Sequence, residues 1–420
     1  MTSVLIADVP GFPASPFGVP DSGFINAIAI DAELRAHVAF VSNIATNGGD
    51  NTLTYAIGTP DGPLQLFGHQ PLIVLKQYQW KFFAVLPPAQ WTLLSLFDLA
   101  LDSQGKAHLC FSEEDTNGPV QTPDLKHGVF NEGNGQFDLS LVQGSSFATG
   151  LAMTIAKDDS VHIAFSDDLG LHYATLAKGS NAFQVAEVDK QQPATIRDVS
   201  IAVGAGGQIG ISYLFLLTGA NTLGLQLRFA QKTPTGWIVD TADPGPISTV
   251  PMNLMNPGAN SLVIDGFGLP HIAYFSASRG LCHGTRTTPG QFFWAVSPSG
   301  NGELVDPTGR PTPAKILLDA NNVLHIAYQA MTPTGTTVLN FATRATAGTW
   351  GVVTVDPSPN CGWGTSAALD PKGMPHFAYG FTPIVNGLIA LKHTYAVNPT
   401  LIPIPQPHKK RPILKRPGQP

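Results

Sequence analysis

Hydrophobic and polar positions alternate along this chain in short runs, and the runs form a unit that repeats about every 50 residues. In each unit an aliphatic run ends at Asp, a glycine-bearing turn follows, and then come His, two small or aliphatic residues and an aromatic. The regular copies lie at 102–111, 265–274, 319–328 and 370–379. Alternation between turn signals is typical of half-buried strands, and a strand-rich repeat of this length is typical of a propeller blade.

Three further copies are degenerate. The first has Asp31, His37 and Phe40 with Leu34 in place of the glycine; the third has Asp158 in what reads as a shortened turn; the fourth keeps Gly207. Seven copies predict an all-β protein, a seven-bladed β-propeller. In each regular turn we expect the Asp to accept hydrogen bonds from the turn amides and the Gly or Asn to adopt a positive φ.

Each blade is expected to hold four strands, because a third strand with the phrase Leu, any residue, aromatic or His follows the His strand, and a fourth often ends in Val-Asp. The predicted blade cores lie near 26–58, 96–142, 151–189, 198–240, 261–297, 314–356 and 366–396. The last blade lacks its fourth strand, and residues 3–9 resemble the strand at 352–356. We therefore expect the N-terminal strand to complete the last blade, since an open ring would leave unpaired sheet edges.

Composition narrows the functions. The formal charge is −6 and charged residues are 12% of the chain, so nucleic acid is an unfavourable partner for the propeller body at 1–397. Residues 398–420 form a Pro-rich basic tail, expected to be flexible, that could bind an anionic surface. The three cysteines have no disulfide or metal spacing, and no cofactor is expected. The N-terminus has neither a signal-peptide core nor a membrane span, which predicts a cytoplasmic location, with non-classical export as the alternative.

The repeated histidines of the second strands, such as His108 and His325, are expected to be structural. They recur once per blade, whereas metal ligands converge on one ion. Positions at which the blades differ are better candidates for binding. On the third strand the residue after Leu is Lys126, Arg228 or Lys392 in three blades, and the next residue is an aromatic in four blades but His127, His283 and His393 in the others. These six residues are our candidate ligand contacts; the alternative is that the imidazoles are half-buried spacers.

One position of the innermost strand also varies. Four residues before the Asp, most blades carry a small residue, but two carry Asp98 and Lys315. If this position lines the central channel, one acid and one base face the channel, either as a site or as a solvated wall.

The repeat, with its Asp, Gly, His-Ile-Ala-Tyr, Leu-x-Tyr-Ala and Trp to Val-Asp phrases, resembles seven-bladed propellers of the sialidase-repeat type and propeller lectins over most of the chain. This resemblance implies carbohydrate as the partner, bound between blades or on one ring face, with binding favoured over catalysis. The alternatives are a polysaccharide lyase or glycoside hydrolase, for which His172, Tyr173 and Arg228 are the candidate catalytic residues, and a protein-interaction scaffold.

Overall fold

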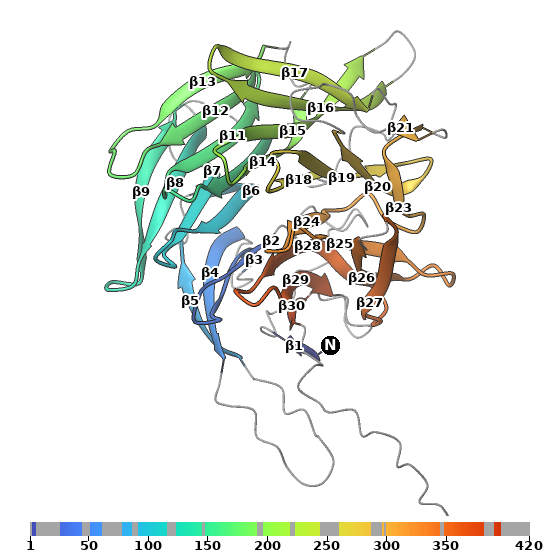
Figure 1. The fold of residues 1–420 in the computed structure, drawn as a ribbon. Coiled ribbons are helices and arrows are strands. Elements are labelled where there is room, and N and C mark those ends of the chain that lie inside the picture. The colour runs from blue at the N-terminus through green and yellow to red at the C-terminus, as the bar shows by residue number, and fades with distance from the viewer. Residues whose placement is uncertain are drawn as a thin grey trace, which may run out of the picture.

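The computed structural model describes the chain over fourteen ranges, which are 2–5, 26–43, 51–60, 78–85, 91–115, 123–144, 148–190, 196–218, 223–243, 260–286, 296–297, 300–344, 348–381 and 390–395. Seven four-stranded antiparallel sheets stand around a common axis in these ranges, as Figure 1 shows. Their innermost strands contact one another in ring order. The seven-bladed all-β propeller expected from the sequence is therefore confirmed.

The strands of the first four blades follow chain order from the axis outward. Blade one comprises β2 (Asn26–Ile30), β3 (Ala36–Asn43), β4 (Asn51–Pro60) and β5 (Tyr78–Ala84). Blade two comprises β6 (Trp91–Leu101), β7 (Ala107–Asp115), β8 (Pro123–Asn131) and β9 (Gln136–Gln143). Blade three comprises β10 (Gly150–Ile155), β11 (Val161–Asp167), β12 (Gly170–Leu176) and β13 (Gln184–Asp189). Blade four comprises β14 (Ile196–Val203), β15 (Ile209–Thr218), β16 (Leu223–Thr233) and β17 (Gly236–Asp243).

The remaining blades contain one insertion and one exchange of chain ends. Blade five comprises β18 (Asn260–Ile264), β19 (Pro270–Ser276), β20 (Gly280–Thr285) and β23 (Glu303–Asp306), with the two-stranded sheet β21 (Val296–Ser297) and β22 (Gly300–Asn301) inserted before β23. Blade six comprises β24 (Lys315–Leu318), β25 (Leu324–Met331), β26 (Thr337–Arg344) and β27 (Trp350–Asp356). Blade seven comprises β28 (Cys361–Leu369), β29 (Pro375–Phe381), β30 (Ala390–Tyr395) and β1 (Thr2–Leu5).

The N-terminal strand closes the ring, as the repeat pattern predicts. β1 pairs antiparallel with β30 in a register that sets Thr2 opposite Tyr395 and Leu5 opposite Lys392. Blade seven therefore contains both ends of the described chain. The basic tail at 398–420 lies outside the described residues. Within the described ranges there is no helix long and apolar enough to cross a membrane.

The turn between the first two strands behaves as expected in the regular blades. In blade two Asp102 Oδ1 accepts the N–H groups of Gln104 (2.9 Å) and Lys106 (2.8 Å), and Gly105 has a φ of 75°. Blade three differs from the sequence interpretation. Its turn is full-length, because the Asp159 N–H bonds to the carbonyl of Ala156 and Asp159 takes the positive φ (63°). Ala156 thus occupies the Asp position, and Asp158 lies inside the turn.

Two fourth strands also end later than the sequence pattern indicates. In blade four the residue equivalent to Asp189 is Asp243, not Asp240, because each of Asp189 and Asp243 pairs with a third-strand Leu beyond a bulge. In blade five the fourth strand ends at Asp306, beyond the predicted core at 261–297. Bulges and the β21–β22 insertion shift these positions, and neither leaves a mark in the spacing of the repeat.

The repeated histidines link the turn to the third strand of their own blade. His37 Nε2 lies 3.2 Å from Asp31 Oδ2, and His37 Nδ1 lies 2.5 Å from the hydroxyl of Tyr55. Where the third strand carries His instead of Tyr, two imidazoles meet. The Nδ1–Nε2 distances are 3.0 Å in His108–His127, 3.1 Å in His271–His283 and 3.1 Å in His376–His393. The structural role expected for the second-strand histidines is confirmed.

Each imidazole pair is also part of a seam between blades. His393 packs edge-on against Tyr78 and Trp80 of blade one, His127 against Phe183 of blade three and His283 against Trp350 of blade six. The hydrophobic core as a whole lies between blades; one cluster, for example, joins Tyr55 of blade one to Phe111 of blade two. At these three seams, burial among aromatic rings favours the neutral form of the imidazoles.

Removal of the N-terminal strand should destabilise the whole ring. A variant lacking residues 1–8 leaves the backbone groups of β30 without the partner that β1 provides, so its Tm in calorimetry should fall by several degrees. A synthetic peptide of residues 1–8 should restore the Tm in a concentration-dependent manner, because it binds only the folded ring. An unchanged Tm in the shortened chain would contradict closure by this strand.

Stability should fall as the pH drops below the normal pKa of histidine. Burial lowers the pKa of His271 and of His376 to about 4 and that of His127 to about 3, and it lowers the pKa of His108, His283 and His393. A folded-state pKa below the unfolded value means that the stabilisation is complete above pH 6.5 and is lost as the pH falls toward 4. For His271 and for His376, a shift of this size corresponds to about 3 kcal/mol.

The chain itself supplies the matched variant. Blades one and three use Tyr where the imidazole pairs have a second His, with hydroxyl–Nδ1 distances of 2.5 and 2.6 Å. The triple variant His127→Tyr, His283→Tyr and His393→Tyr should lose less Tm than the wild type between about pH 7 and pH 4.5. Equal losses in calorimetry would assign the acid sensitivity to other groups.

Candidate functional site

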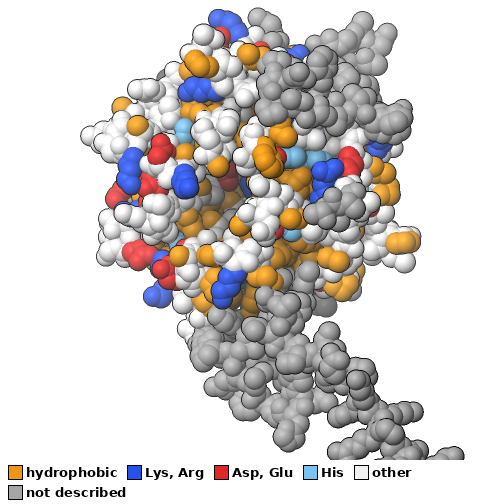
Figure 2. Space-filling model, viewed as in Figure 1, with side chains coloured by type: hydrophobic (Ala, Val, Ile, Leu, Met, Phe, Trp, Pro, Cys, Tyr) orange, Lys and Arg blue, Asp and Glu red, His pale blue; other side chains and the backbone are white. Residues whose placement is uncertain are grey.

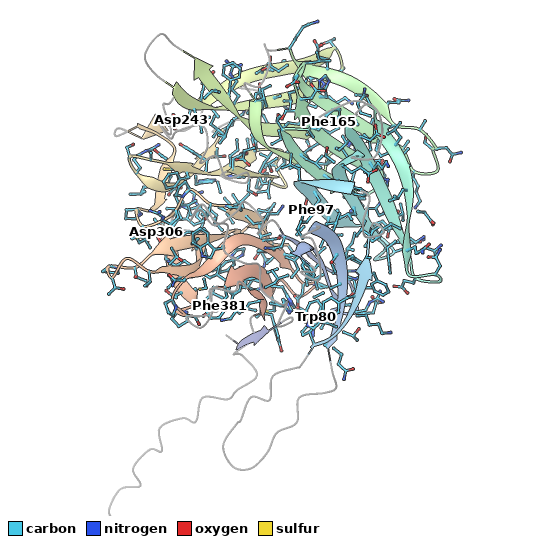
Figure 3. All side chains as sticks on the ribbon, turned by 180° about the vertical axis from the view of Figure 1, so that it is seen from behind. Trp80, Phe97, Phe165, Asp243, Asp306 and Phe381 are labelled. Atoms are coloured by element: carbon cyan, nitrogen blue, oxygen red, sulfur yellow. The ribbon has the colours of Figure 1, made fainter. Side chains whose placement is uncertain are left out.

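A cavity lies on the ring axis and is formed by the innermost strands of all seven blades. Its volume is about 130 Å³. One position of each strand lines it, the position four residues before the Asp of the turn or its equivalent. These seven residues, called the axial ring below, are Ala27, Asp98, Ala152, Ser200, Ser261, Lys315 and Ser366. The expectation that Asp98 and Lys315 face the channel is confirmed. Figure 2 shows the hollow at the centre of one ring face, and in Figure 3 the neighbouring Phe97 lies near the axis.

Most polar members of the axial ring fasten one blade to the next. Ser366 Oγ accepts the Ile28 N–H (3.0 Å), Ser200 Oγ the Leu262 N–H (3.1 Å) and Ser261 Oγ the Ile316 N–H (3.2 Å). Each acceptor lies on one blade and its donor on the following blade. The pattern explains why Ser recurs at this position, since a short hydroxyl reaches the inward-facing amide of the neighbouring strand.

Asp98 makes the same contact with a carboxylate. Its Oδ2 accepts the Met153 N–H of blade three and its Oδ1 accepts the Leu99 N–H, both at 2.9 Å. Two backbone amides therefore fix the orientation of the carboxylate, while its remaining acceptor capacity is directed at the cavity. Asp98 is half-buried.

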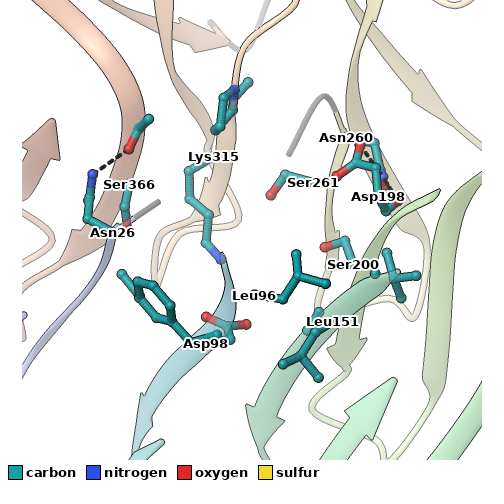
Figure 4. Close-up of a pocket in the computed structure, with 18 of the residues that line it drawn as sticks. Asn26, Leu96, Asp98, Leu151, Asp198, Ser200, Asn260, Ser261, Lys315 and Ser366 are labelled. Carbon is teal, nitrogen blue, oxygen red and sulfur yellow. Dashed lines mark hydrogen bonds between the residues drawn. The ribbon is translucent and has the colours of Figure 1, made fainter. Parts of the chain in front are cut away.

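Lys315 is the exception in the axial ring. An ammonium has no acceptor capacity, so it cannot bind the amide of blade seven as Ser would. The Lys315 side chain extends across the cavity toward Asp98, as Figure 4 shows. It makes neither a hydrogen bond nor an ion pair with any residue in the described ranges. The axial cavity thus contains a fixed carboxylate and a free ammonium on non-adjacent blades.

Polar side chains also occur one step above the axial ring. Asn26 Nδ2 donates to the Gly364 carbonyl (2.6 Å), while its buried Oδ1 has no partner among the described residues. Asn260 Nδ2 donates to Asp198 Oδ2 (2.8 Å). Asp198 has a φ of 50° at a bulge in β14, a conformation that costs energy outside glycine and often marks a functional position. Figure 4 shows this pair across the cavity from Asn26.

The cavity walls between these polar groups are apolar. Phe97, Leu151 and Pro313 contribute to the lining. A small concave site with a few convergent polar groups on apolar walls is the usual form of a small-molecule site. Among the described residues, the axial cavity therefore offers hydrogen-bond donors, acceptors and apolar contact surface within one enclosure.

Two of the six predicted contact residues are held by carboxylates of the preceding blade. Arg228 Nη1 lies 3.3 Å from Asp189 Oδ2 and its guanidinium carbon lies 3.5 Å from the centre of the Phe215 ring. Lys392 Nζ lies 3.0 Å from Asp356 Oδ2 and 3.8 Å from the centre of the Phe381 ring. Both cations therefore bridge neighbouring blades.

The aspartate at the end of a fourth strand also accepts a hydrogen bond from the hydroxyl of a second-strand Tyr on the following blade. We call this contact a latch. Four latches occur among the described contacts. They are Tyr213 to Asp189 (2.5 Å), Tyr274 to Asp243 (2.8 Å), Tyr328 to Asp306 (2.5 Å) and Tyr379 to Asp356 (2.7 Å). The aromatic is Tyr in these four blades and Phe at 40, 111 and 165.

Lys126 and His172 are paired within their own blades. Lys126 Nζ contacts Glu113 Oε1, and Glu113 is buried. His172 Nε2 lies 2.9 Å from Asp167 Oδ1. In both blades the preceding blade supplies no described latch carboxylate. An acid on the second strand of the same blade takes its place as the partner of the third-strand side chain.

The other predicted residues lie inside the blades or between them. His127, His283 and His393 are at most 1% exposed, which favours the alternative that they are spacers. Tyr173 is buried and its hydroxyl lies 2.6 Å from His162 Nδ1. No described contact joins His172 or Tyr173 to Arg228. Ligand contact by any of these residues stays a prediction.

Sequence reasoning missed Asn26, Asp198 and Asn260. A polar residue directly before a small axial-ring residue, at the start of an otherwise apolar strand, was the available signal for Asn26 and Asn260. No such signal existed for Asp198, because its position depends on the bulge.

The described residues contain no group of three His, Cys, Asp or Glu side chains suited to a metal ion. All three cysteines are buried and free, and burial raises the pKa of the Cys282 thiol to about 11.

No family model and no curated protein matches the sequence. Among solved structures, the fold is similar to an α-L-arabinanase of Penicillium chrysogenum complexed with arabinobiose (11% identity, 85% of this chain and 98% of that chain, TM-score 0.49). It is also similar to a mutant of AofleA from Arthrobotrys oligospora (11%, 79% and 86%, 0.47) and to the NanB sialidase of Streptococcus pneumoniae (8%, 88% and 68%, 0.43). At these scores the propeller assignment rests on the seven blades themselves.

Proposed function

We propose that this protein is a carbohydrate-binding propeller whose ligand occupies the axial cavity, on the ring face where the innermost strands begin. The observation that carries the proposal is the free ammonium of Lys315 opposite the fixed carboxylate of Asp98. Sugars present hydroxyl groups that both donate and accept, together with apolar C–H faces. The cavity provides matching acceptors, donors and apolar walls.

The alternative sites between blades are less favourable for binding. Arg228, Lys392, Lys126 and His172 already have carboxylate partners in the protein. A ligand at those positions would have to replace an existing ion pair, whereas Lys315 has no such pair among the described residues. The axial position therefore replaces the inter-blade clefts in our proposal.

Glycoside hydrolysis is the second candidate, because the carboxylates of Asp98 and Asp198 line the same cavity. Glycosidases generally use two carboxylates, one as acid and one as base or nucleophile. Release of reducing sugar from oligosaccharides that the protein binds would favour this candidate. Binding to a glycan array without product formation would favour the binding protein.

The variant Lys315→Ser tests whether the axial ring position is kept for a ligand. Serine restores the hydroxyl that other blades use to accept the amide of the next blade, here that of Ala367. The variant should therefore gain about 1 kcal/mol in the free energy of unfolding and lose glycan-array binding. A gain in stability together with a loss of binding is the expected sign of a residue retained for function.

Lys157→Met is the matched control, because Lys157 is exposed on a turn at the opposite end of the innermost strands. This variant should keep both stability and binding. If Lys315→Ser keeps full binding while Lys157→Met also binds, the ligand site lies away from the axis. If neither the wild type nor the control binds any glycan, the proposed function is wrong.

A further inference from the structure

The charges in the axial cavity indicate what kind of sugar it takes. The charged side chains that line it in the described ranges are Asp98, Asp198 and Lys315, two carboxylates and one ammonium. A ligand carboxylate would be attracted by Lys315 but repelled by Asp98 and Asp198, and it would add a third negative group to a lining that already has one more carboxylate than ammonium. A neutral ligand avoids this cost. The lining therefore favours a neutral sugar over a uronic or other acidic sugar.

The opposed chemistry of Asp98 and Lys315 suits two adjacent hydroxyl groups. The two side chains face each other across the cavity but form no ion pair. A carboxylate only accepts hydrogen bonds and an ammonium only donates them. One ligand hydroxyl can donate to Asp98 while its neighbour accepts from Lys315, so a vicinal diol satisfies both charges without adding one.

The surroundings of Asp98 hold this geometry in advance. The Leu99 and Met153 N–H groups fix the carboxylate from two directions at 2.9 Å, so little orientation is lost when a ligand binds. The walls formed by Phe97 and Leu151 present apolar surface next to it, against which the C–H face of a sugar ring can pack. A cavity of about 130 Å³ has room for roughly one ring.

We propose that the axial cavity binds the terminal unit of a neutral glycan by clamping a vicinal diol between Asp98 and Lys315. This inference rests on the proposed function and adds to it the ligand class, the recognised group and the two residues that recognise it. It excludes acidic sugars as the preferred ligands.

The test uses defined methyl glycosides and the full chain. The neutral panel is the methyl glycosides of glucose, galactose, mannose and arabinose, measured by calorimetric titration. For the glycoside that binds best, the 6-carboxylate or other acid form and the single-deoxy forms at each diol position are then compared. We expect the acid form and the deoxy forms of the clamped diol to bind about tenfold more weakly or worse.

Variants identify the clamp residues. Lys315→Met and Asp98→Asn should each weaken binding of the best glycoside by about tenfold or more. Lys315 has no partner in the protein, so Lys315→Met should keep the Tm even if Asp98→Asn lowers it by disturbing the two amides. Lys157→Met and Asp138→Asn, at exposed positions, serve as controls and should bind as the wild type does. For the deoxy glycoside lacking the hydroxyl at Lys315, Lys315→Met should make no further difference.

The outcomes separate this inference from the proposed function. Tighter binding of the acid form would overturn the neutral-sugar class and leave a carbohydrate-binding protein. Unchanged affinity of Lys315→Met for a glycoside that the wild type binds would overturn the diol clamp and place the sugar elsewhere. Absence of binding to every glycoside and to the glycan array would overturn both proposals together.

Discussion

Ring closure is the constraint on which the rest of this structure depends. A blade of four strands buries its two faces only against two neighbours, so none of the seven is complete until the last meets the first. That junction depends on a four-stranded sheet assembled from both ends of the chain, with β1 added to β30. The aromatic contacts of His393 with Tyr78 and Trp80 lie at the same junction. Backbone pairing and side-chain packing therefore close the ring together.

The blades are joined at three radii by different chemistry. Near the axis, Ser hydroxyls accept amides of the next blade. Further out, aspartates at the ends of fourth strands latch onto tyrosines. Imidazoles pack on aromatics of the next blade in three seams. Each type of contact is used by only some of the blades. Where the preceding blade supplies no carboxylate, an acid of the same blade replaces it, as Glu113 does for Lys126 and Asp167 does for His172.

The fold was largely predictable because the same local sequence pattern recurs in seven copies, four of them regular and three degenerate. The Asp, the left-handed turn residue and the following His are local features, and the structure places them as expected, from Gly105 to Gly373. The missing fourth strand of blade seven could be found because Val4 and its neighbours resemble another fourth strand. The features that were not found depend on bulges. The full-length turn at Ala156 was misread because Asp158 offered a nearer match, and Asp243 was missed because the strand register shifts beside Leu227.

The candidate site was predictable only in part, because the sequence shows which positions vary but not which side chains are paired in the folded protein. Asp98 and Lys315 depart from a position that is otherwise small, and that departure is visible in the sequence. Arg228, Lys126 and Lys392 vary in the same conspicuous way, yet their partners, such as Asp189 and Asp356, lie on other strands or other blades. The sequence cannot distinguish a polar residue that has a partner in the protein from one that has none.

That distinction is the ground for our proposal that the axial ring binds a ligand. A repeat protein gains stability wherever a blade follows the common pattern, and a departure is retained at a cost unless another contact compensates for it. Arg228 is compensated by Asp189 and Lys126 by Glu113. Lys315 gives up the inter-blade hydrogen bond that Ser261 and Ser366 make and receives no partner from the described protein in return. Our proposal supplies that partner with a ligand that enters the cavity along the axis.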